Sequence, residues 1–247
     1  MIYENLLFFH IPKAGGSSIE KMFLPNHKQL NFVANLIFKE SKFSRWVCCT
    51  MRNRNWRIFI FLLVSIFMSD RKNLWGIHNG KILHHLTYLD IYKREKYYLR
   101  HTPSLTLTSL IKWCIVRNPY DRIISAYHFI GNNLPFDKFV YWVYDELDKY
   151  YRHKQEPFVV ILPQWEFIIN EHGKNGMDEV LHFETLKRDF KAFKKKYNLQ
   201  HLTLPHINAR KRHSSNLKSY YTKELEEMVY HMYKWDFKML KYKRIKI

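Results

Sequence analysis

Residues 6–18 read LLFFHIPKAGGSS, and they carry the clearest indication of the fold. The apolar run of residues 6–9 is typical of a short buried strand, and the proline and the glycine pair that follow predict a loop. Ser17 and Ser18, with apolar residues at helical spacing behind them, indicate that a helix begins directly after the glycines. This order of strand, loop and helix predicts one unit of a parallel α/β sheet.

The loop has the composition of an anion-binding site. Glycine lets the backbone come close to a ligand, and the N–H groups at a helix start bind anions. The loop adds one cation and two hydroxyl groups to the glycines: Lys13, Gly15, Gly16, Ser17 and Ser18. The lysine precedes the glycines, so the pattern is not the nucleoside-triphosphate motif GxxxxGK[ST]. A glycine-rich turn with a purely structural role remains the alternative for this loop taken alone.

A second unit of the same kind is found in residues 113–127, which read WCIVRNPYDRIISAY. An apolar run ends at Arg117, and Pro119 fits the first turn of the helix that follows. Arg117 offers a planar fork suited to a phosphate group, and Ser125 on the helix can donate a hydroxyl to the same group. Alternatively, neither residue binds a phosphate: Arg117 binds only a carboxylate, and Ser125 is only a small residue at a packing contact. Two such units place a ligand at the carboxyl ends of the strands.

The rest of the chain predicts further α/β structure in one domain of residues 1–247. Residues 180–183 read as another strand, and residues 186–197 as an amphipathic helix with many basic residues. Thr222 is expected to cap a last helix. Residues 41–73 lack clean periodicity and are interpreted as a buried helix or a pair of strands.

The charge of the chain points to an anionic partner. Its 41 Lys and Arg outnumber its 22 Asp and Glu, which gives a formal net charge of +19. Nucleic acid, a membrane surface, a nucleotide and an acidic polymer all fit this charge. Cysteine occurs at positions 48, 49 and 114 without CxxC spacing, so neither a metal site nor a disulfide framework is expected. The longest apolar run, residues 58–68, is too short for a membrane span of about 20 residues.

The two motifs together resemble the sulfotransferases that use 3′-phosphoadenosine 5′-phosphosulfate (PAPS). The 5′-phosphosulfate loop of that family reads like HIPKTGGTS, and its 3′-phosphate motif reads like VRNPYDRLVSAY. This chain departs mainly at Ala14 and Ser17, where the family often has threonine. The resemblance implies a P-loop-like parallel sheet flanked by helices. It implies in-line transfer of a sulfuryl group from PAPS to an acceptor hydroxyl, with Lys13 stabilising the leaving oxygen. The residues implied to hold the donor are Lys13, Gly15, Gly16, Ser17 and Ser18 at the 5′ end, and Arg117 and Ser125 at the 3′-phosphate.

Other segments resemble the carbohydrate branch of the family. Residues 84–90, HHLTYLD, look like the HVSYLDF segment of heparan sulfate 2-O-sulfotransferases. This match implies a glycan acceptor, expected to be anionic, and makes His85 the catalytic base, with His84 as its competitor. Residues 183–190, 205–208 and 233–237 resemble the same branch. Arg210 and Lys211 follow the second of these, and in relatives such a basic loop can close over the 3′-phosphate. A solvated loop is the alternative there.

A nucleic-acid- or polyanion-binding protein without catalysis is the main rival hypothesis. Phosphate contacts would explain the charge, but the two motifs would then be coincidental. No recognised nucleic-acid motif occurs, so no nucleic-acid partner is expected. A sulfotransferase fold without activity is left open by residues 41–73. The sequence as given, without a membrane span, leads us to expect a soluble intracellular protein. If an N-terminal anchor is missing, the resemblance implies a Golgi membrane protein.

Overall fold

The computed structural model describes residues 2–3, 5–23, 77–78, 81–82, 85–93, 106–130, 133–155, 158–204 and 217–247. Within these residues the main sheet has four strands in the order β1-β2-β5-β6. They are β1 (Ile2–Tyr3), β2 (Leu6–Phe9), β5 (Ile111–Val116) and β6 (Glu179–His182). Strand β1 is antiparallel to β2, whereas β2, β5 and β6 are mutually parallel. The predicted parallel α/β sheet is therefore confirmed.

The parallel strands bring three chain segments to one edge of the sheet. Phe9 pairs with Cys114, and Val116 pairs with His182, at the carboxyl ends of the strands. All four residues of β2 are buried, as expected for a parallel strand covered on both faces. His10, Arg117 and Phe183 follow directly after the three strands. This common edge positions the candidate site.

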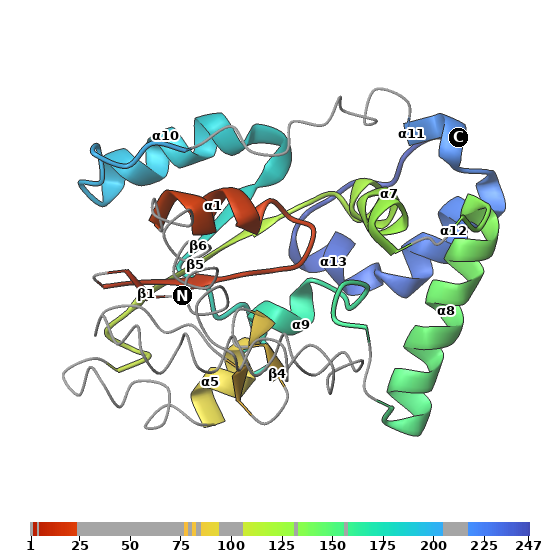
Figure 1. Ribbon diagram of the computed structural model, residues 1–247, viewed down its shortest axis with the longest axis horizontal. Helices are drawn as coiled ribbons and strands as arrows, with labels where there is room; N and C mark the ends of the chain where they lie inside the picture. Colours follow the sequence, from red (N-terminus) through yellow and green to blue (C-terminus); the bar gives the residue numbers. More distant parts are fainter. Residues whose placement is uncertain are drawn as a thin grey trace, which may run out of the picture.

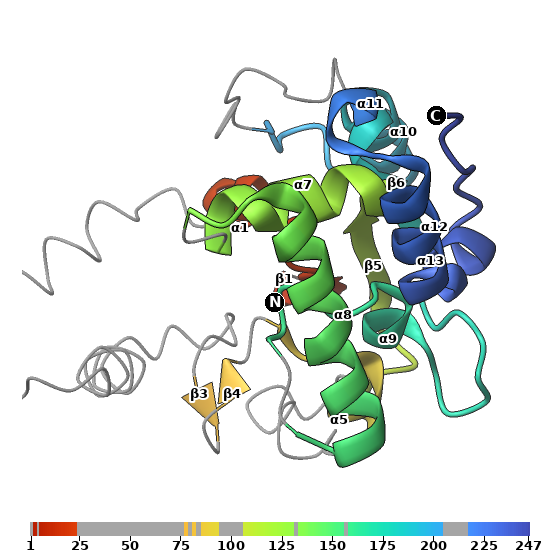
Figure 2. The same cartoon turned by 90° about the vertical axis from the view of Figure 1, so that its right-hand side faces the viewer.

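Helices cover both faces of the sheet, as Figures 1 and 2 show. On one side lie α1 (Gly16–Phe23) and α10 (Leu186–Lys196), and on the other lie α5 (Tyr88–Lys93) and α9 (Trp165–Ile168). Beyond the carboxyl ends of the strands stand α7 (Pro119–Ile130), α8 (Phe136–His153), α12 (Lys223–Met232) and α13 (Lys234–Met239). The shorter elements are α11 (Leu217–Tyr220), the 3₁₀ turn η2 (Phe183–Thr185), and the two-stranded sheet of β3 (Ile77–His78) and β4 (Lys81–Ile82).

The core is aromatic where α10 meets the sheet. The ring of Trp113 on β5 lies 4.7 Å from that of Phe193 and 6.4 Å from that of Phe190, measured between centroids. Cys114, next to Trp113, is fully buried, and this burial raises the pKa of its thiol. The predicted amphipathic helix is thus confirmed, with its apolar side on the sheet.

The sequence predicted the last helix correctly and one strand end wrongly. The hydroxyl of Thr222 accepts a hydrogen bond of 3.2 Å from the backbone N–H of Leu225, so it caps α12 as expected. Strand β6 ends at His182, so the strand predicted over residues 180–183 extends one residue too far. Phe183 instead begins η2. Residues 41–73, Cys48 and Cys49 lie outside the described residues, and the single domain over residues 1–247 stays a prediction. Among the described helices, none is long and apolar enough to cross a membrane.

Candidate functional site

The loop between β2 and α1 is wound tightly by two residues in the left-handed region. Gly15 has a φ of 97° and Lys13 a φ of 64°. Such a backbone conformation costs an L-residue roughly 1–2 kcal/mol, and residues held in it tend to cluster at ligand sites. The turn closes with a hydrogen bond of 3.1 Å from Ser18 N–H to the Gly15 carbonyl. Helix α1 thus begins at once after the turn, and the first N–H groups of a helix have no partner within it.

Two arginines hold the carbonyl groups of this loop. Arg122 donates from Nε to the Pro12 carbonyl at 3.0 Å, and Arg117 donates from Nη1 to the Lys13 carbonyl at 3.1 Å. These bonds turn the negative ends of two peptide groups toward the arginines. A loop whose carbonyls are occupied in this way is compatible with anion binding, which stays a prediction.

Arg122 is a site residue that the sequence did not predict. Its side chain is 1% exposed, and its Nη2 donates to the Val160 carbonyl at 3.0 Å. Desolvation lowers the pKa of the guanidinium, while Tyr233 and Asp236 favour the charged form. Arginine stays protonated in proteins, so the hydrogen bond from Arg122 to the loop comes from a buried positive charge. Its place in the motif RNPYDR, five residues after Arg117, was the available signal.

Arg117 is fixed on several sides. Its Nε donates to Asp121 Oδ2 at 2.7 Å, and its guanidinium carbon lies 4.4 Å from the centroid of the Phe183 ring. Arg117 therefore binds a carboxylate, as the alternative interpretation of the sequence predicts. Within the described residues, Nη2 of Arg117 donates no hydrogen bond, so this edge can donate to a ligand. Phosphate binding by Arg117 stays a prediction.

The backbone of Arg117 is held by a buried polar group. Gln164 accepts from the Arg117 N–H at 2.9 Å and donates to the Arg117 carbonyl at 2.7 Å. Asp236 in turn accepts from the backbone N–H groups of Gln164 at 3.0 Å and Trp165 at 2.9 Å. Asp236 is fully buried; this raises the pKa of its carboxyl, against the effect of Arg122 and of these donors. The segment at residues 233–237 therefore braces the site.

Lys13 lies against the helix that carries Ser125. Its ammonium is 4.1 Å from the centroid of the Phe129 ring, one turn after Ser125 on α7. Asp121, Ser125 and Phe129 are four residues apart and share one face of this helix. Ser17 and Ser18 lie in the first turn of α1, exposed and half-buried respectively. The structure thus brings the lysine of the first motif to the helix of the second.

His85 is joined to the same loop through His10. Its Nδ1 lies 3.1 Å from the backbone carbonyl of His10, and the two imidazole rings are 4.7 Å apart. A carbonyl only accepts, so Nδ1 must carry the proton, and in the neutral imidazole Nε2 is then the basic nitrogen. The His10 ring also covers Gly16, where an added Cβ would come within 2.2 Å of it. Only glycine therefore fits at this position without a shift.

The start of α5 is fixed close to His85. Thr87 N–H donates to Asp90 Oδ2 at 3.1 Å, and Asp90 N–H donates back to Thr87 Oγ1 at 3.1 Å. This reciprocal pair is a capping box, which fixes the entry of the chain into the helix. It follows His85 by two residues and so limits where the imidazole can lie. His84, Arg210 and Lys211 lie outside the described residues.

A comparison with family models finds a match over nearly the whole chain. The model described as "Sulfotransferase family" matches residues 3–243 of the chain. The chain therefore belongs to the sulfotransferase family, and it is an enzyme that transfers a sulfuryl group from a donor co-substrate to an acceptor hydroxyl. Neither the comparison with curated proteins nor that with solved structures finds a match.

Gly16→Ala tests the contact between the loop and His10. The new methyl group must displace the His10 ring, at a cost of about 1–3 kcal/mol, and this disturbs the loop and the carbonyl that holds His85. We expect sulfuryl transfer to fall at least about tenfold, the equivalent of 1.4 kcal/mol. Transfer rates and melting temperatures of the two proteins would measure this.

Gly173→Ala is the matched control. Gly173, unlike Gly16, has a positive φ of 71°, and nothing lies within 4 Å of an added Cβ. The control should lose stability through backbone strain and keep its transfer rate. If Gly16→Ala were as active as the control, the packing of His10 on Gly16 would have no role in the site.

Proposed function

We propose that this enzyme uses PAPS as its donor and sulfates a hydroxyl of a carbohydrate, with His85 as the general base. One observation carries the proposal. The hydrogen bond from Arg117 Nη1 to the Lys13 carbonyl joins the two motifs, which are 104 residues apart in the chain. Two candidate anion sites in direct contact suit a donor with two anionic groups.

PAPS has its anionic groups at the two ends that this arrangement offers. The turn before α1 and its hydroxyls suit the 5′-phosphosulfate, for which we propose Lys13, Gly15, Gly16, Ser17 and Ser18. The open edge of Arg117 and the hydroxyl of Ser125 suit the 3′-phosphate. A donor without a 3′-phosphate would leave Arg117 and Ser125 without an anionic group to bind. Arg210 and Lys211 are proposed as further contacts of the 3′-phosphate, on the strength of the family resemblance.

The transfer then needs positioning and charge stabilisation more than covalent catalysis, as in phosphoryl transfer. The acceptor oxygen attacks sulfur in line, and the bond from sulfur to the 5′-phosphate oxygen breaks. Negative charge develops on that oxygen, beside Lys13 and the positive end of α1. The proton of the acceptor hydroxyl passes to Nε2 of His85. The products are the sulfated acceptor and adenosine 3′,5′-bisphosphate.

An anionic glycan is the acceptor that we propose. The net charge of +19 favours an acidic partner, and the resemblance of residues 84–90 favours the carbohydrate branch. The proposed base lies on the segment that carries this resemblance, directly before α5. Binding of a polyanion without catalysis would leave the orientation of His85 by the His10 carbonyl unexplained.

Lys13→Ala tests the proposed role of the lysine in transfer. We expect turnover to fall by about 10²–10³-fold, the usual loss for one donor to a developing oxyanion. The measurement is transfer of labelled sulfate from PAPS to a panel of glycans. Lys138→Ala, which removes an exposed lysine on α8, is the control and should be fully active. Near-normal turnover in Lys13→Ala would remove this residue from the mechanism.

His85→Ala tests the base. Turnover should fall by about 10²–10⁴-fold, the usual contribution of general-base catalysis, while calorimetry should find donor affinity unchanged. A protonated imidazole cannot accept the acceptor's proton, so wild-type activity should be lost as the pH falls through the titration of the base. This acidic limb of the profile should be absent from the residual activity of the variant.

His84→Ala is the control for the register of the match. It should keep both its turnover and the acidic limb. The opposite result, with His84→Ala inactive and His85→Ala active, would move the base by one residue. Full activity in both variants would rule out either histidine as the base.

A further inference from the structure

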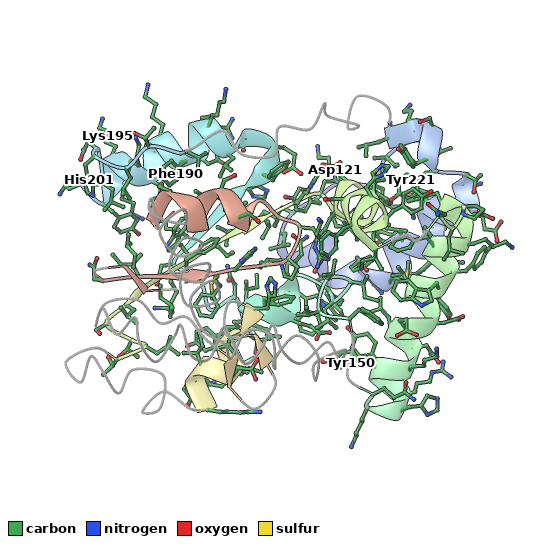
Figure 3. All side chains as sticks on the ribbon, viewed as in Figure 1. Asp121, Tyr150, Phe190, Lys195, His201 and Tyr221 are labelled. Atoms are coloured by element: carbon green, nitrogen blue, oxygen red, sulfur yellow. The ribbon has the colours of Figure 1, made fainter. Side chains whose placement is uncertain are left out.

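Helix α10 presents a continuous basic row on its outer face. Lys187, Lys191 and Lys195 are four residues apart, so they lie one above another along the helix. All three are exposed, as is Arg188 beside them. The apolar side of α10 lies on the sheet, as described above. Figure 3 shows Phe190 on the side of α10 nearer the sheet and Lys195 at the far end of the helix.

The stability of the helix does not explain this row. Like charges four residues apart on a helix destabilise it by about 0.2–0.5 kcal/mol per pair. Lys187 and Arg188 also lie in the first turn, where the helix dipole favours acidic side chains. Only the lysines at positions 194–196 lie at the end where a positive charge is stabilising. The row therefore costs the isolated helix free energy.

Neighbouring carboxylates leave most of the row uncompensated. Arg188 pairs with Asp189 at 3.1 Å, and Lys196 pairs with Glu179. In the part of the chain that the structure describes, Lys187, Lys191 and Lys195 form no ion pair. Three ammonium groups in line, at a rise of about 6 Å per four residues, can thus accept charges from outside.

We infer that the outer face of α10 is a binding surface for a linear anionic glycan, separate from the place of sulfuryl transfer. Helices that bind membranes carry bulky apolar side chains beside their lysines, whereas the one exposed apolar residue between Lys187 and Lys195 is Ala192. Surfaces for single-stranded nucleic acid carry aromatic rings for base stacking, and this face has none. Sulfate or carboxylate groups along one chain match a straight row of ammonium groups.

The position of the row gives it a role different from catalysis. Helix α10 lies on one side of the sheet, and α5, which follows His85, lies on the other in both views (Figures 1 and 2). The row therefore holds a polymer away from the reacting hydroxyl. A second contact on the same polymer raises the effective concentration of acceptor sites. The choice of a glycan rests on the proposed function, but binding can be measured without transfer.

The test compares two triple variants of equal net charge. Lys187→Glu, Lys191→Glu and Lys195→Glu together reverse the row on α10. Exposed lysines on α11, α12 and α13 serve as the matched control, changed together as Lys218→Glu, Lys223→Glu and Lys234→Glu. Affinity for heparin oligosaccharides at physiological salt should fall about tenfold or more in the first variant, the sum of three exposed charge pairs, and little in the control. Melting temperatures check both folds, and the glutamine triple replaces the glutamate one if the latter does not fold.

Transfer kinetics give the second readout. In the α10 variant, KM for a long anionic glycan should rise by a similar factor, with kcat and KM for PAPS unchanged and a short oligosaccharide acceptor unaffected. Equal weakening of heparin binding in both triple variants would show that only the net charge matters, and this would overturn the proposal. So would unchanged heparin binding, or a loss confined to anionic vesicles or to nucleic acid. If the wild type sulfates no glycan at all, the proposed acceptor is wrong, and the heparin measurement still decides on α10.

Discussion

The site depends on the hydrogen bonds that two arginines donate to the loop carbonyls. Arg122 donates to the Pro12 carbonyl and Arg117 to the Lys13 carbonyl, so the tight turn before α1 keeps both carbonyls directed toward the arginines. The chain can place both arginines there because β2 and β5 are parallel neighbours and end at the same edge. Sheet topology, loop conformation and charge are thus joined by two contacts.

Further contacts fix the positions of Arg117 and of the proposed base, His85. Asp236 and Gln164 fix the backbone of Arg117 from the C-terminal part of the chain. On the other side, the His10 ring covers Gly16, and the His10 carbonyl accepts from His85. The proposed donor loop and the proposed base are therefore two ends of one packed unit. For this reason, we expect a change at Gly16 to affect both the loop and the position of His85.

Local patterns predicted the elements well. The apolar run of β2, the proline that begins α7, the apolar spacing of α10 and the Thr222 cap are signals within a few residues, and the structure has each of them. The glycines and Lys13 of the loop predict an anion-binding site, and this stays a prediction. The order of the two motifs indicated the family, which the family comparison confirms.

Contacts between distant segments were not predictable in the same way. Phe183 read as the end of an apolar strand, yet its ring lies against Arg117. The roles of Arg122, Gln164 and Asp236 arise from hydrogen bonds across 47 to 110 residues, which no local period encodes. The hints available were an arginine within the second motif and the family resemblance of residues 233–237, which include Asp236. The roles of Arg210 and Lys211 stay predictions.

The central claim is that the loop before α1 and the Arg117 edge form one site for a nucleotide with two anionic ends. Calorimetry with adenosine 3′,5′-bisphosphate and with adenosine 5′-monophosphate tests it most directly. A charge-assisted hydrogen bond to the 3′-phosphate contributes about 1.5–3 kcal/mol, so the bisphosphate should bind at least about tenfold more tightly. That advantage should shrink in Arg117→Ala, even if both ligands weaken. Equal affinity of the wild type for the two nucleotides would contradict the account.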